Sequence, residues 1–236
     1  MRLDNYIFKQ GITQSRNKAQ ELIRSNQVLV NSKVISKTSF DVDESCEITL
    51  LDAKQYVSRA GYKLKTYLSE QTVVSPKNSI CLDIGSSTGG FVQVLLEEGA
   101  KKVVAVDIGS EQLHKSLKNN NKLEFFENMD IRDFKYNQKF DIVTCDISFI
   151  GVEHILNDID RFAKEYIIIL FKPQFEVGTG VKRDKKGVVK DDFAIKKAKD
   201  RFEAFALQKW DLIDVKNSSL KGKEGNIETF FCFKKR

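Results

Sequence analysis

The sequence predicts an α/β protein: a Rossmann-like domain built on a mostly parallel, seven-stranded sheet with a reversed edge strand, preceded by a small α+β domain. Three observations support this prediction. From residue 80 onward, short apolar runs typical of buried strands alternate with helical stretches. A glycine-rich turn joins the first of these runs to a helix. The last two runs, 210–215 and 227–233, follow each other with no helix between them, as expected for an antiparallel pair.

The glycine-rich turn is the most informative stretch. Residues 80–84 form an apolar, β-type run, and the apolar positions from Val92 onward indicate a helix that Gly99 ends. In an open α/β sheet, a glycine loop between a strand and a helix is a place where cofactors bind. The glycines at 85, 89 and 90 leave room for a ligand to approach the backbone. An ordinary turn without a ligand is the alternative.

The residues of this turn favour S-adenosylmethionine as the cofactor. No Lys-Ser or Lys-Thr pair follows the last glycine, which excludes a P-loop. The Gly-x-x-x-Gly-Gly spacing differs from the dinucleotide fingerprint, and a carboxylate at Asp83 would repel a pyrophosphate. That carboxylate suits a cationic ligand that carries an amino acid, as S-adenosylmethionine does. The cofactor contacts expected here are Asp83, Gly85, Ser86, Ser87, Gly89, Gly90 and Phe91.

Two further acids follow the next predicted strands. Strand 102–108 contains Asp107 near its end, about 20 residues beyond the glycine loop, where an acid typically holds ribose hydroxyls. We include its neighbour Ile108 among the cofactor contacts. Strand 123–127 is followed by Asp130, which we expect to contact the adenine amino group.

The remaining elements alternate in the same way. We expect a strand at 140–145 that ends at Asp146, a helix at 153–163, and a strand at 166–171 that ends at Lys172. The polar loop 178–187 then lies at the ligand edge of the sheet and is a candidate lid or substrate loop. A basic helix at 190–209 has a mixed face that we expect to lie in the core, made of Phe193, Ala194, Ala198, Phe202, Phe205 and Ala206.

Residues 1–52 are predicted to form a separate domain, followed by a linker at 53–57 and the larger domain at 58–236. A helix at 4–9 ends at Gly11, and Thr13 or Ser15 caps a second helix that runs to about residue 26. A hairpin of 28–30 and 33–35 and a strand at 46–51 complete this domain. In the larger domain, Ser58 can cap a first helix that runs to about residue 69.

Charge is unevenly distributed along the chain. Residues 1–37 carry a net charge of +5, residues 54–66 carry +4, residues 67–171 carry −5, and residues 172–236 carry +7. An acidic α/β centre between basic flanks favours a polyanionic partner held by those flanks. Solvated lysines explain the C-terminal excess about as well, but they explain the compact N-terminal cluster less well.

Composition excludes several other classes of protein. The four cysteines form no Cys-x-x-Cys pair and lie in apolar runs, so we expect small core residues in a reducing compartment. Two histidines, His114 and His154, are too few for a histidine-rich metal site, and no metal is expected. No signal peptide is visible, and the longest apolar run, 166–171, is too short to span a bilayer. The expectation is a cytoplasmic protein without membrane contact.

Three polar residues at strand ends suggest chemistry: Asp83, Asp146 and Lys172. A lysine directly after a buried apolar strand is unusual. Lys172 is a candidate general base for a hydroxyl group, with Asp146 as the residue that binds and orients it. A lysine that snorkels from a strand end to the surface is the alternative.

The first fifty residues resemble the S4 RNA-binding domain. The pattern consists of Arg2-Leu3-Asp4, Gly11-Ile12, Ser15-Arg16, Ala19, Ile23 and Val28-x-Val30-Asn31. Asn31-Ser32 replaces the usual Asn-Gly of the hairpin, and Asn26 or Gln27 replaces the usual glycine before the first strand; asparagine tolerates left-handed backbone angles. The resemblance implies binding of structured RNA, with basic side chains gripping phosphates. The RNA-binding residues expected are Arg2, Arg16, Lys18, Arg24, Lys33 and, after the linker, Arg59.

Over essentially its whole length the chain resembles the TlyA, or haemolysin-A-like, family. The motifs are Ser58-Arg-x-Gly-x-Lys-Leu, Asp83-Ile-Gly-x-Ser-Thr-Gly-Gly-Phe, Cys145-Asp-x-Ser-Phe-Ile, Lys172-Pro-Gln-Phe-Glu and Gly225-Asn-x-Glu. Within them, Lys63, Asp146, Lys172 and Glu228 resemble the Lys-Asp-Lys-Glu tetrad of FtsJ-type ribose 2′-O-methyltransferases. The resemblance implies methyl transfer from S-adenosylmethionine to the 2′-hydroxyl of cytidine in ribosomal RNA or a ribosomal subunit. Which nucleotide and which subunit stay open.

Three other functions compete with this prediction. A noncatalytic RNA-binding assembly factor is disfavoured because all four tetrad positions are filled. A membrane-acting haemolysin, suggested by the family's name, lacks a membrane span, a secretion signal and a strongly amphipathic free helix in this sequence. A nicotinamide-dependent oxidoreductase is disfavoured by the glycine spacing.

Overall fold

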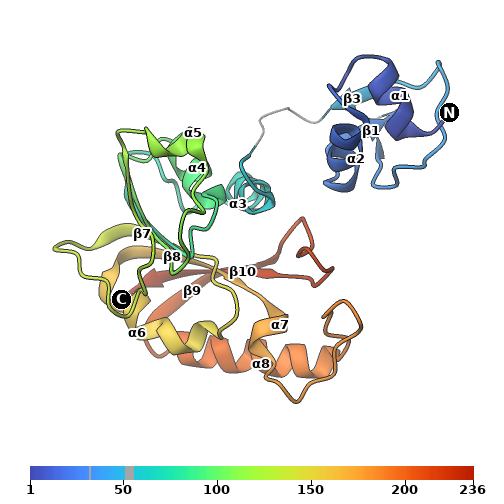
Figure 1. Ribbon diagram of the computed structural model, residues 1–236. Coiled ribbons are helices and arrows are strands. Elements are labelled where there is room, and N and C mark those ends of the chain that lie inside the picture. Colours follow the sequence, from blue (N-terminus) through green and yellow to red (C-terminus); the bar gives the residue numbers. More distant parts are fainter. Residues whose placement is uncertain (32, 51–55) are drawn as a thin grey trace. The chain divides into compact units, whose positions relative to one another are not determined.

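The computed structural model describes residues 1–31, 33–50 and 56–236. It consists of two compact units, Met1–Gln55 and Tyr56–Arg236, each with its own hydrophobic core. Figure 1 shows the helices and strands of each unit. The predicted linker 53–57 lies partly outside the described residues, as do Ser32 of the predicted hairpin and Leu51 of the predicted strand.

The first unit packs two helices against a three-stranded antiparallel sheet of order β2-β1-β3. Its helices are α1 (Leu3–Lys9) and α2 (Arg16–Arg24), and its strands are β1 (Val28–Val30), β2 (Lys33–Val34) and β3 (Ile48–Leu50). Ser15 caps α2, since its side chain accepts a hydrogen bond from the Lys18 amide at 3.1 Å. Asn26 and Asn31 adopt φ of 60° and 49°, which fits the tolerance expected of asparagine at these turns.

The second unit is built on a seven-stranded sheet of order β6-β5-β4-β7-β8-β10-β9. The predicted mostly parallel sheet is confirmed: β10 runs opposite to the other six strands of this sheet, and the pairs that it does not form are all parallel. The reversed strand lies second from the edge, because the last strand of the chain inserts between β8 and β9. The strands are β4 (Ile80–Ile84), β5 (Lys102–Val106), β6 (Leu123–Phe126), β7 (Phe140–Cys145), β8 (Ala163–Phe171), β9 (Trp210–Asn217) and β10 (Thr229–Lys235).

Helices cover both faces of this sheet (Figure 1). Alternate strand residues point to opposite faces: Leu82 and Ile169 join one core layer, and Cys81 and Ile168 join the other. The first layer includes residues of α6 and α8, and the second includes residues of α3 and α4. The helical elements are α3 (Arg59–Glu70), α4 (Gly90–Glu97), α5 (Lys115–Lys118), the 3-10 helix η1 (Val152–Ile155), α6 (Leu156–Phe162), α7 (Pro173–Glu176) and α8 (Asp192–Ala206).

Three predictions about individual residues need correction. On α8, Ala198, Phe202 and Ala206 are buried, but Phe193 and Phe205 are 77% and 44% exposed. At about 3.6 residues per turn, Phe193 lies on the side of the helix opposite to the stripe of Ala198, Phe202 and Ala206, and Phe205 lies at the edge of that stripe. Ser58 precedes α3 but makes no capping bond.

Of the cysteines, Cys81, Cys145 and Cys232 are buried, as expected. Cys46 is only half-buried and precedes β3 instead of lying in it.

Candidate active site and cofactor site

Four polar side chains lie where neighbouring strands of the sheet end. Asp83 is the fourth residue of β4, while Asp107, Asp146 and Lys172 directly follow β5, β7 and β8. These strands run parallel, so their carboxyl ends share one edge of the sheet. This edge is where open α/β sheets bind ligands.

The turn after β4 needs glycine at two positions. Gly85 has a φ of +79°, and a Cβ there would lie 3.0 Å from the Asp146 carbonyl oxygen. Gly89 has a φ of +91° and lies against Leu113 and Leu117, where a Cβ would overlap both side chains. A side chain at either position would therefore strain the backbone and crowd the turn.

The next two residues of the turn serve packing more than ligand binding. A Cβ on Gly90 would collide with the Ser58 hydroxyl oxygen and lie 2.8 Å from the Gly61 amide nitrogen. Gly90 therefore lets α4 approach α3, whereas the sequence suggested that it makes room for a ligand. The Phe91 side chain is buried and packs on Phe230, with ring centroids 6.2 Å apart, so only its backbone is available to a cofactor.

Asp83 is a buried acid with an unused oxygen. Its Oδ1 accepts a hydrogen bond from Thr144 Oγ1 at 2.7 Å. Its Oδ2 is buried and has no hydrogen-bond partner among the described residues. Burial raises the pKa of Asp83 to about 7, with smaller contributions from the nearby Asp146 and Asp107. A cationic ligand at this oxygen would satisfy it and favour the charged form.

Asp107 organises the glycine loop from the neighbouring strand. Its Oδ2 accepts from the Ser87 amide at 2.7 Å, and its Oδ1 accepts from the Gly109 amide at 2.6 Å. Ile108, next to it, is 72% exposed, which is unusual for an isoleucine beside a buried strand. The Asp130 carboxylate is already paired, because Arg132 Nη2 lies 2.5 Å from its Oδ2. The hydrogen bond from Arg132 lowers the pKa of Asp130. A contact with a ligand would thus have to compete with Arg132.

The four residues of the predicted tetrad form two buried ion pairs. Lys172 Nζ lies 2.7 Å from Asp146 Oδ1, and Lys63 Nζ lies 2.5 Å from Glu228 Oε2. Lys63 comes from α3, and Glu228 immediately precedes β10. Because β10 runs antiparallel to β8, with Thr229 opposite Phe171, Glu228 is brought to the end of β8. Residues 165 positions apart thereby form one pair.

These two pairs also act on each other. Burial raises the pKa of Asp146, and this effect is opposed by Lys172 and by the more distant Lys63. Glu228 raises it further. Two cations and two anions therefore form one electrostatic group, in which a change of charge at one member affects the others.

Several residues of the site were missed in the sequence. Ser148 Oγ accepts a hydrogen bond from Lys172 Nζ at 2.9 Å, and the Asp146 carbonyl oxygen accepts another at 3.3 Å. Thr144 is the partner of Asp83. A Cβ on Gly222 would lie 2.6 Å from Glu228 Oε1, so this glycine leaves room for the carboxylate. Ser148 lies within the motif that begins at Cys145, but only the fold shows which residue it contacts.

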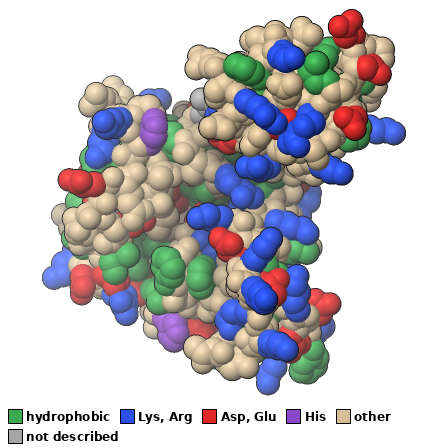
Figure 2. All heavy atoms as spheres, turned by 45° about the vertical axis from the view of Figure 1, so that its right-hand side comes forward, with side chains coloured by type: hydrophobic (Ala, Val, Ile, Leu, Met, Phe, Trp, Pro, Cys, Tyr) green, Lys and Arg blue, Asp and Glu red, His purple; other side chains and the backbone are tan. Residues whose placement is uncertain are grey.

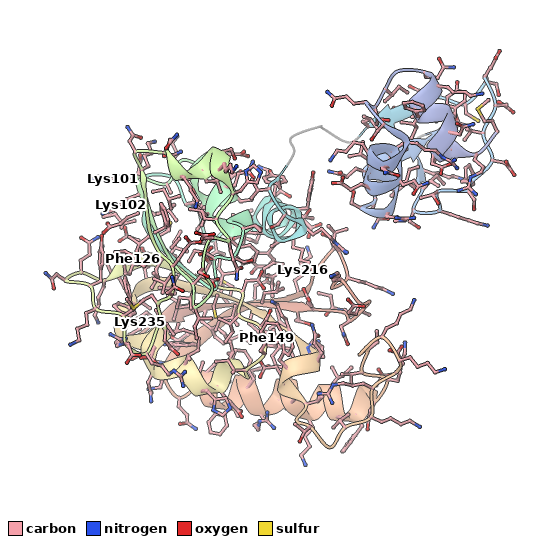
Figure 3. All side chains as sticks on the ribbon, in the orientation of Figure 1. Lys101, Lys102, Phe126, Phe149, Lys216 and Lys235 are labelled. Atoms are coloured by element: carbon pink, nitrogen blue, oxygen red, sulfur yellow. The ribbon has the colours of Figure 1, made fainter. Side chains whose placement is uncertain are left out.

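Phe149, labelled in Figure 3, is an exposed aromatic residue that directly follows Ser148, the contact of Lys172. It adopts a φ of 75°, which is strained for a residue other than glycine. Its ring lies 5.5 Å from that of Phe175. Its position after the predicted strand 140–145, within the motif that begins at Cys145, separates it from the phenylalanines of the strands, but only the fold shows its exposure.

Comparison with known proteins identifies the family. Residues 56–235 match the model of the FtsJ-like methyltransferases, and residues 1–48 match the S4 domain. The chain is 49% identical to the 23S rRNA (cytidine-2′-O)-methyltransferase TlyA of Campylobacter jejuni, over 99% of both chains. It is 33% identical to the 16S/23S rRNA (cytidine-2′-O)-methyltransferase TlyA of Mycobacterium tuberculosis, over 97% of this chain and 88% of that protein. The chain belongs to the TlyA family of FtsJ-like methyltransferases.

A solved structure agrees with this assignment. A provisionally named hemolysin from Streptococcus thermophilus is similar over 100% of this chain and 88% of that one, with 29% identity and a TM-score of 0.72. Among the described residues of this TlyA-family chain, no helix is long and apolar enough to cross a membrane. In the same part of the chain, no group of three or more His, Cys, Asp or Glu side chains is placed to hold a metal ion.

In the S4 unit, a buried acid orients two of the predicted RNA-binding arginines. Asp4 is fully buried and lies 3.1 Å from Arg2 Nε and 3.0 Å from Arg16 Nη2. Hydrogen bonds from Arg2, Gln20 and Arg16 keep the pKa of Asp4 well below its usual range. Both arginines remain about half exposed, so their guanidinium groups are held in place while accessible to a phosphate.

The other predicted RNA-binding residues are held less firmly. Lys18 pairs with Glu21 at 2.9 Å on the surface of α2, and Arg24 donates to Gln20 at 3.4 Å. Lys33 is exposed. In the methyltransferase unit, Arg59 Nη2 donates to the Lys221 carbonyl oxygen at 2.7 Å, which ties the start of α3 to the loop before β10.

Two loops of the methyltransferase unit are rich in exposed lysines. One follows α7 and contains the predicted lid or substrate loop, and the other lies between β9 and Glu228. Figure 2 shows Lys and Arg side chains gathered on the face of this unit that is turned toward the viewer. The exposed lysines of the two loops are Lys182, Lys185, Lys186, Lys190, Lys221 and Lys223.

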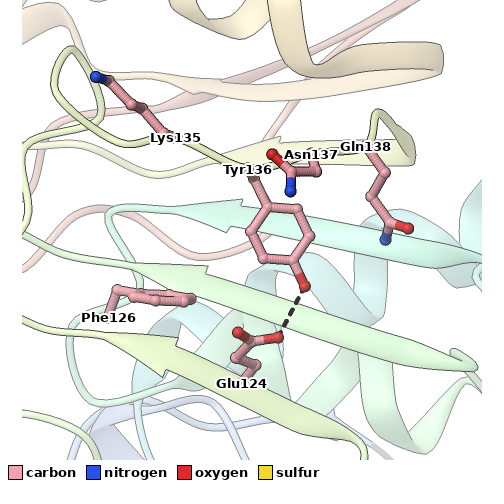
Figure 4. Close-up of a pocket in the computed structure, with 6 residues that line it drawn as sticks. All are labelled: Glu124, Phe126, Lys135, Tyr136, Asn137 and Gln138. Atoms are coloured by element: carbon pink, nitrogen blue, oxygen red, sulfur yellow. Dashed lines mark hydrogen bonds between the residues drawn. The ribbon is translucent and has the colours of Figure 1, made fainter.

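A cavity of about 480 Å³ opens beside edge strand β6 and contains none of the predicted site residues (Figure 4). It is lined by Glu124 and Phe126 of β6 and by residues 135–138. Glu124 accepts a hydrogen bond from Tyr136 at 2.8 Å and pairs with Lys102 at 2.6 Å. Glu124 is thus satisfied by Tyr136 and Lys102, and the remaining charged group, Lys135, is an exposed surface lysine, so this cavity provides no reason to place a ligand in it.

Proposed function

We propose that this protein transfers a methyl group from S-adenosylmethionine to the 2′-hydroxyl of a cytidine in ribosomal RNA. The observation that carries the proposal is the pair of buried ion pairs, Lys172–Asp146 and Lys63–Glu228, at the sheet edge that also holds the glycine turn. The relatives from Campylobacter jejuni and Mycobacterium tuberculosis are named for this reaction on ribosomal RNA.

The residues around the glycine turn fit S-adenosylmethionine. The buried Oδ2 of Asp83 lacks a partner and suits the amino group of the cofactor's amino-acid moiety. Asp107 is the candidate for the ribose hydroxyls, and the exposed Ile108 is a candidate apolar contact for the adenine. When bound, the cofactor would supply a methyl group on a cationic sulfur, which an oxygen nucleophile could take by in-line displacement as the carbon–sulfur bond breaks and neutral S-adenosylhomocysteine leaves.

The chain's own contribution is to position the ribose oxygen and to move its proton. Lys172 and Asp146 are the proposed proton-handling pair: burial makes Asp146 a better proton acceptor than a surface acid, and Lys172 lies against it. Ser148 holds the Lys172 amino group from another side. Lys63, fixed by Glu228, is proposed to donate a hydrogen bond to the 2′-oxygen.

Basic surfaces of both units are proposed to bind the RNA. In the S4 unit, the buried Asp4 pre-orients Arg2 and Arg16 for phosphate contacts. In the methyltransferase unit, exposed lysines of the loops after α7 and before Glu228 provide a second cationic surface. We propose that the target ribose swings out of its helix to reach the tetrad, by analogy with enzymes that modify bases.

The decisive test replaces the lysine after β8. We expect Lys172→Ala to lower methylation of ribosomal RNA by at least about 100-fold, because general acid–base groups typically contribute that much. Binding of S-adenosylmethionine and of RNA should stay within about twofold of the wild type, as expected for a residue needed only for the transfer step. Lys164→Ala is the matched control, since Lys164 pairs with Asp141 on the surface.

Mapping 2′-O-methyl marks on ribosomal RNA with and without the protein would identify the target nucleotide and subunit. Wild-type turnover in Lys172→Ala would contradict the proposed role of the tetrad. Absence of any new mark would instead favour the noncatalytic assembly factor.

A further inference from the structure

Glu176 is a buried acid that the proposed reaction does not use. It is the last residue of α7, four positions after Lys172, and it is 5% exposed. Its Oε1 accepts a hydrogen bond from the backbone amide of Val152 at 2.9 Å. Val152 is the first residue of η1, so this carboxylate satisfies an amide that the helix itself leaves free.

Residues 172–176 and residues 146–152 are connected at two points, and the hydrogen bond of Glu176 is the second of them. At one end, Lys172 contacts Asp146 and Ser148. At the other end, Glu176 holds Val152. The residues in between, 147–151, include Ser148 and the strained Phe149, so this short segment is fixed on both sides.

Gly151 makes room for this arrangement. Its φ of −71° is ordinary for any residue, so the backbone does not require glycine. A Cβ at this position would, however, lie 3.1 Å from Glu176 Oε2 and press on the carboxylate. Gly151 and Glu176 therefore fit each other, on the segment that carries a contact of Lys172.

The surroundings of Glu176 disfavour the ionised form of its side chain. Burial raises the pKa of Glu176 to about 7, and the neighbouring Glu153 raises it further, while Arg201 and the Val152 amide lower it. Arg201 donates to Glu153 Oε2 at 2.9 Å and to the Glu176 carbonyl oxygen at 2.9 Å, rather than to the Glu176 carboxylate. A buried acid kept in this position calls for a role beyond filling space.

We propose that Glu176 is a positioning residue for the methyl transfer: it fixes segment 147–151 so that Ser148 stays on Lys172. The inference rests on the role proposed above for Lys172. It predicts an effect on the rate of transfer, because the carboxylate of Glu176 bonds the end of the segment that carries Ser148, the contact of Lys172.

The test compares two substitutions of similar size. Glu176→Gln keeps an oxygen that can accept from the Val152 amide, whereas Glu176→Leu removes it. We expect Glu176→Leu to lower the single-turnover methylation rate by on the order of 10- to 100-fold, because a small displacement of a catalytic group has effects of this size. Glu176→Gln should stay within about threefold of the wild type. Affinities for S-adenosylmethionine and RNA should change by no more than about twofold in both variants.

Hydrogen exchange provides a second readout, independent of activity. The Val152 amide should exchange faster in Glu176→Leu than in the wild type, and Glu176→Gln should restore its protection. Glu153→Gln is the matched control: it removes a neighbouring acid that shares Arg201 but does not hold the segment. Gly151→Ala, which crowds the carboxylate without straining the backbone, should reproduce the loss of rate.

A wild-type rate in Glu176→Leu, together with faster exchange at Val152, would overturn the inference. If Glu176→Leu does not fold, Gly151→Ala decides: a wild-type rate there, together with faster exchange at the Val152 amide, overturns the inference equally. Lys172→Ala is measured in parallel. Full activity of that variant would refute the proposed function, whereas an inactive Lys172→Ala beside a fully active Glu176→Leu would refute only the role of Glu176.

Discussion

At the scale of single residues, the buried carboxyl group of Asp83 should make cofactor binding depend on pH. Its pKa of about 7 means that the free protein holds a proton on this buried acid below neutral pH. If the cofactor's amino group needs the ionised form, affinity for S-adenosylmethionine should fall about tenfold for each pH unit below 7 and level off above it. Calorimetry at pH 6 in buffers of different ionisation enthalpy should show release of about one proton on binding.

The same group affects stability in the absence of cofactor. Between about pH 4 and pH 7 the folded protein holds this proton and the unfolded chain does not, so the free energy of unfolding should fall as pH rises through that window. Asp83→Asn should abolish the pH dependence of cofactor binding. Glu176→Gln is the control, because Glu176 also titrates near pH 7 but lies outside the cofactor site. Cofactor affinity independent of pH in the wild type would refute the contact with Asp83.

At the scale of elements, the packing of α3 on α4 positions Lys63. Gly90 lies against Ser58, Ala60 and Gly61, so any side chain there must push the two helices apart. We expect Gly90→Ala to destabilise the protein by about 1–3 kcal/mol and to lower the midpoint of thermal unfolding. Gly180→Ala is the matched control, since a Cβ at Gly180 meets nothing within 4 Å. An unchanged midpoint in Gly90→Ala would show that the helices can separate freely.

The elements also show which features of the fold and of the site could be predicted from the sequence alone. Strand ends were predictable because an apolar run that stops at an acid or a lysine is a local pattern, as at Asp146 and Lys172. The sequence also suggested Asp146 as the partner of Lys172. The pairing of Lys63 with Glu228 could not be derived from a local pattern, because it depends on β10 inserting beside β8. The exposure of Phe193 was missed for a different reason: the helical period places it on the side of α8 opposite to Ala198 and Phe202, and grouping all apolar residues into one mixed face overlooked this.

At the scale of the whole molecule, basic segments precede and follow the acidic stretch 67–171 in the sequence, and each unit contains at least one of them. If the S4 unit grips RNA phosphates, replacing both Arg16 and Lys18 by alanine should weaken RNA binding. The slope of log affinity against log salt concentration should become shallower by about one to two, because each lost phosphate contact releases about one counterion fewer. Filter binding or fluorescence anisotropy over a series of salt concentrations measures this slope.

A matched control separates this contact from net charge. Lys118→Ala with Lys122→Ala removes the same two charges from exposed positions of the acidic central region, and its salt slope should equal that of the wild type. Equal slopes in both double variants and the wild type would show that the S4 unit does not provide the phosphate contacts. An equally shallow salt slope in both double variants would mean that RNA binding depends on total charge. A shallower slope only in the Arg16→Ala and Lys18→Ala variant would instead place the phosphate contacts at the arginine that Asp4 holds and at the lysine two residues after it.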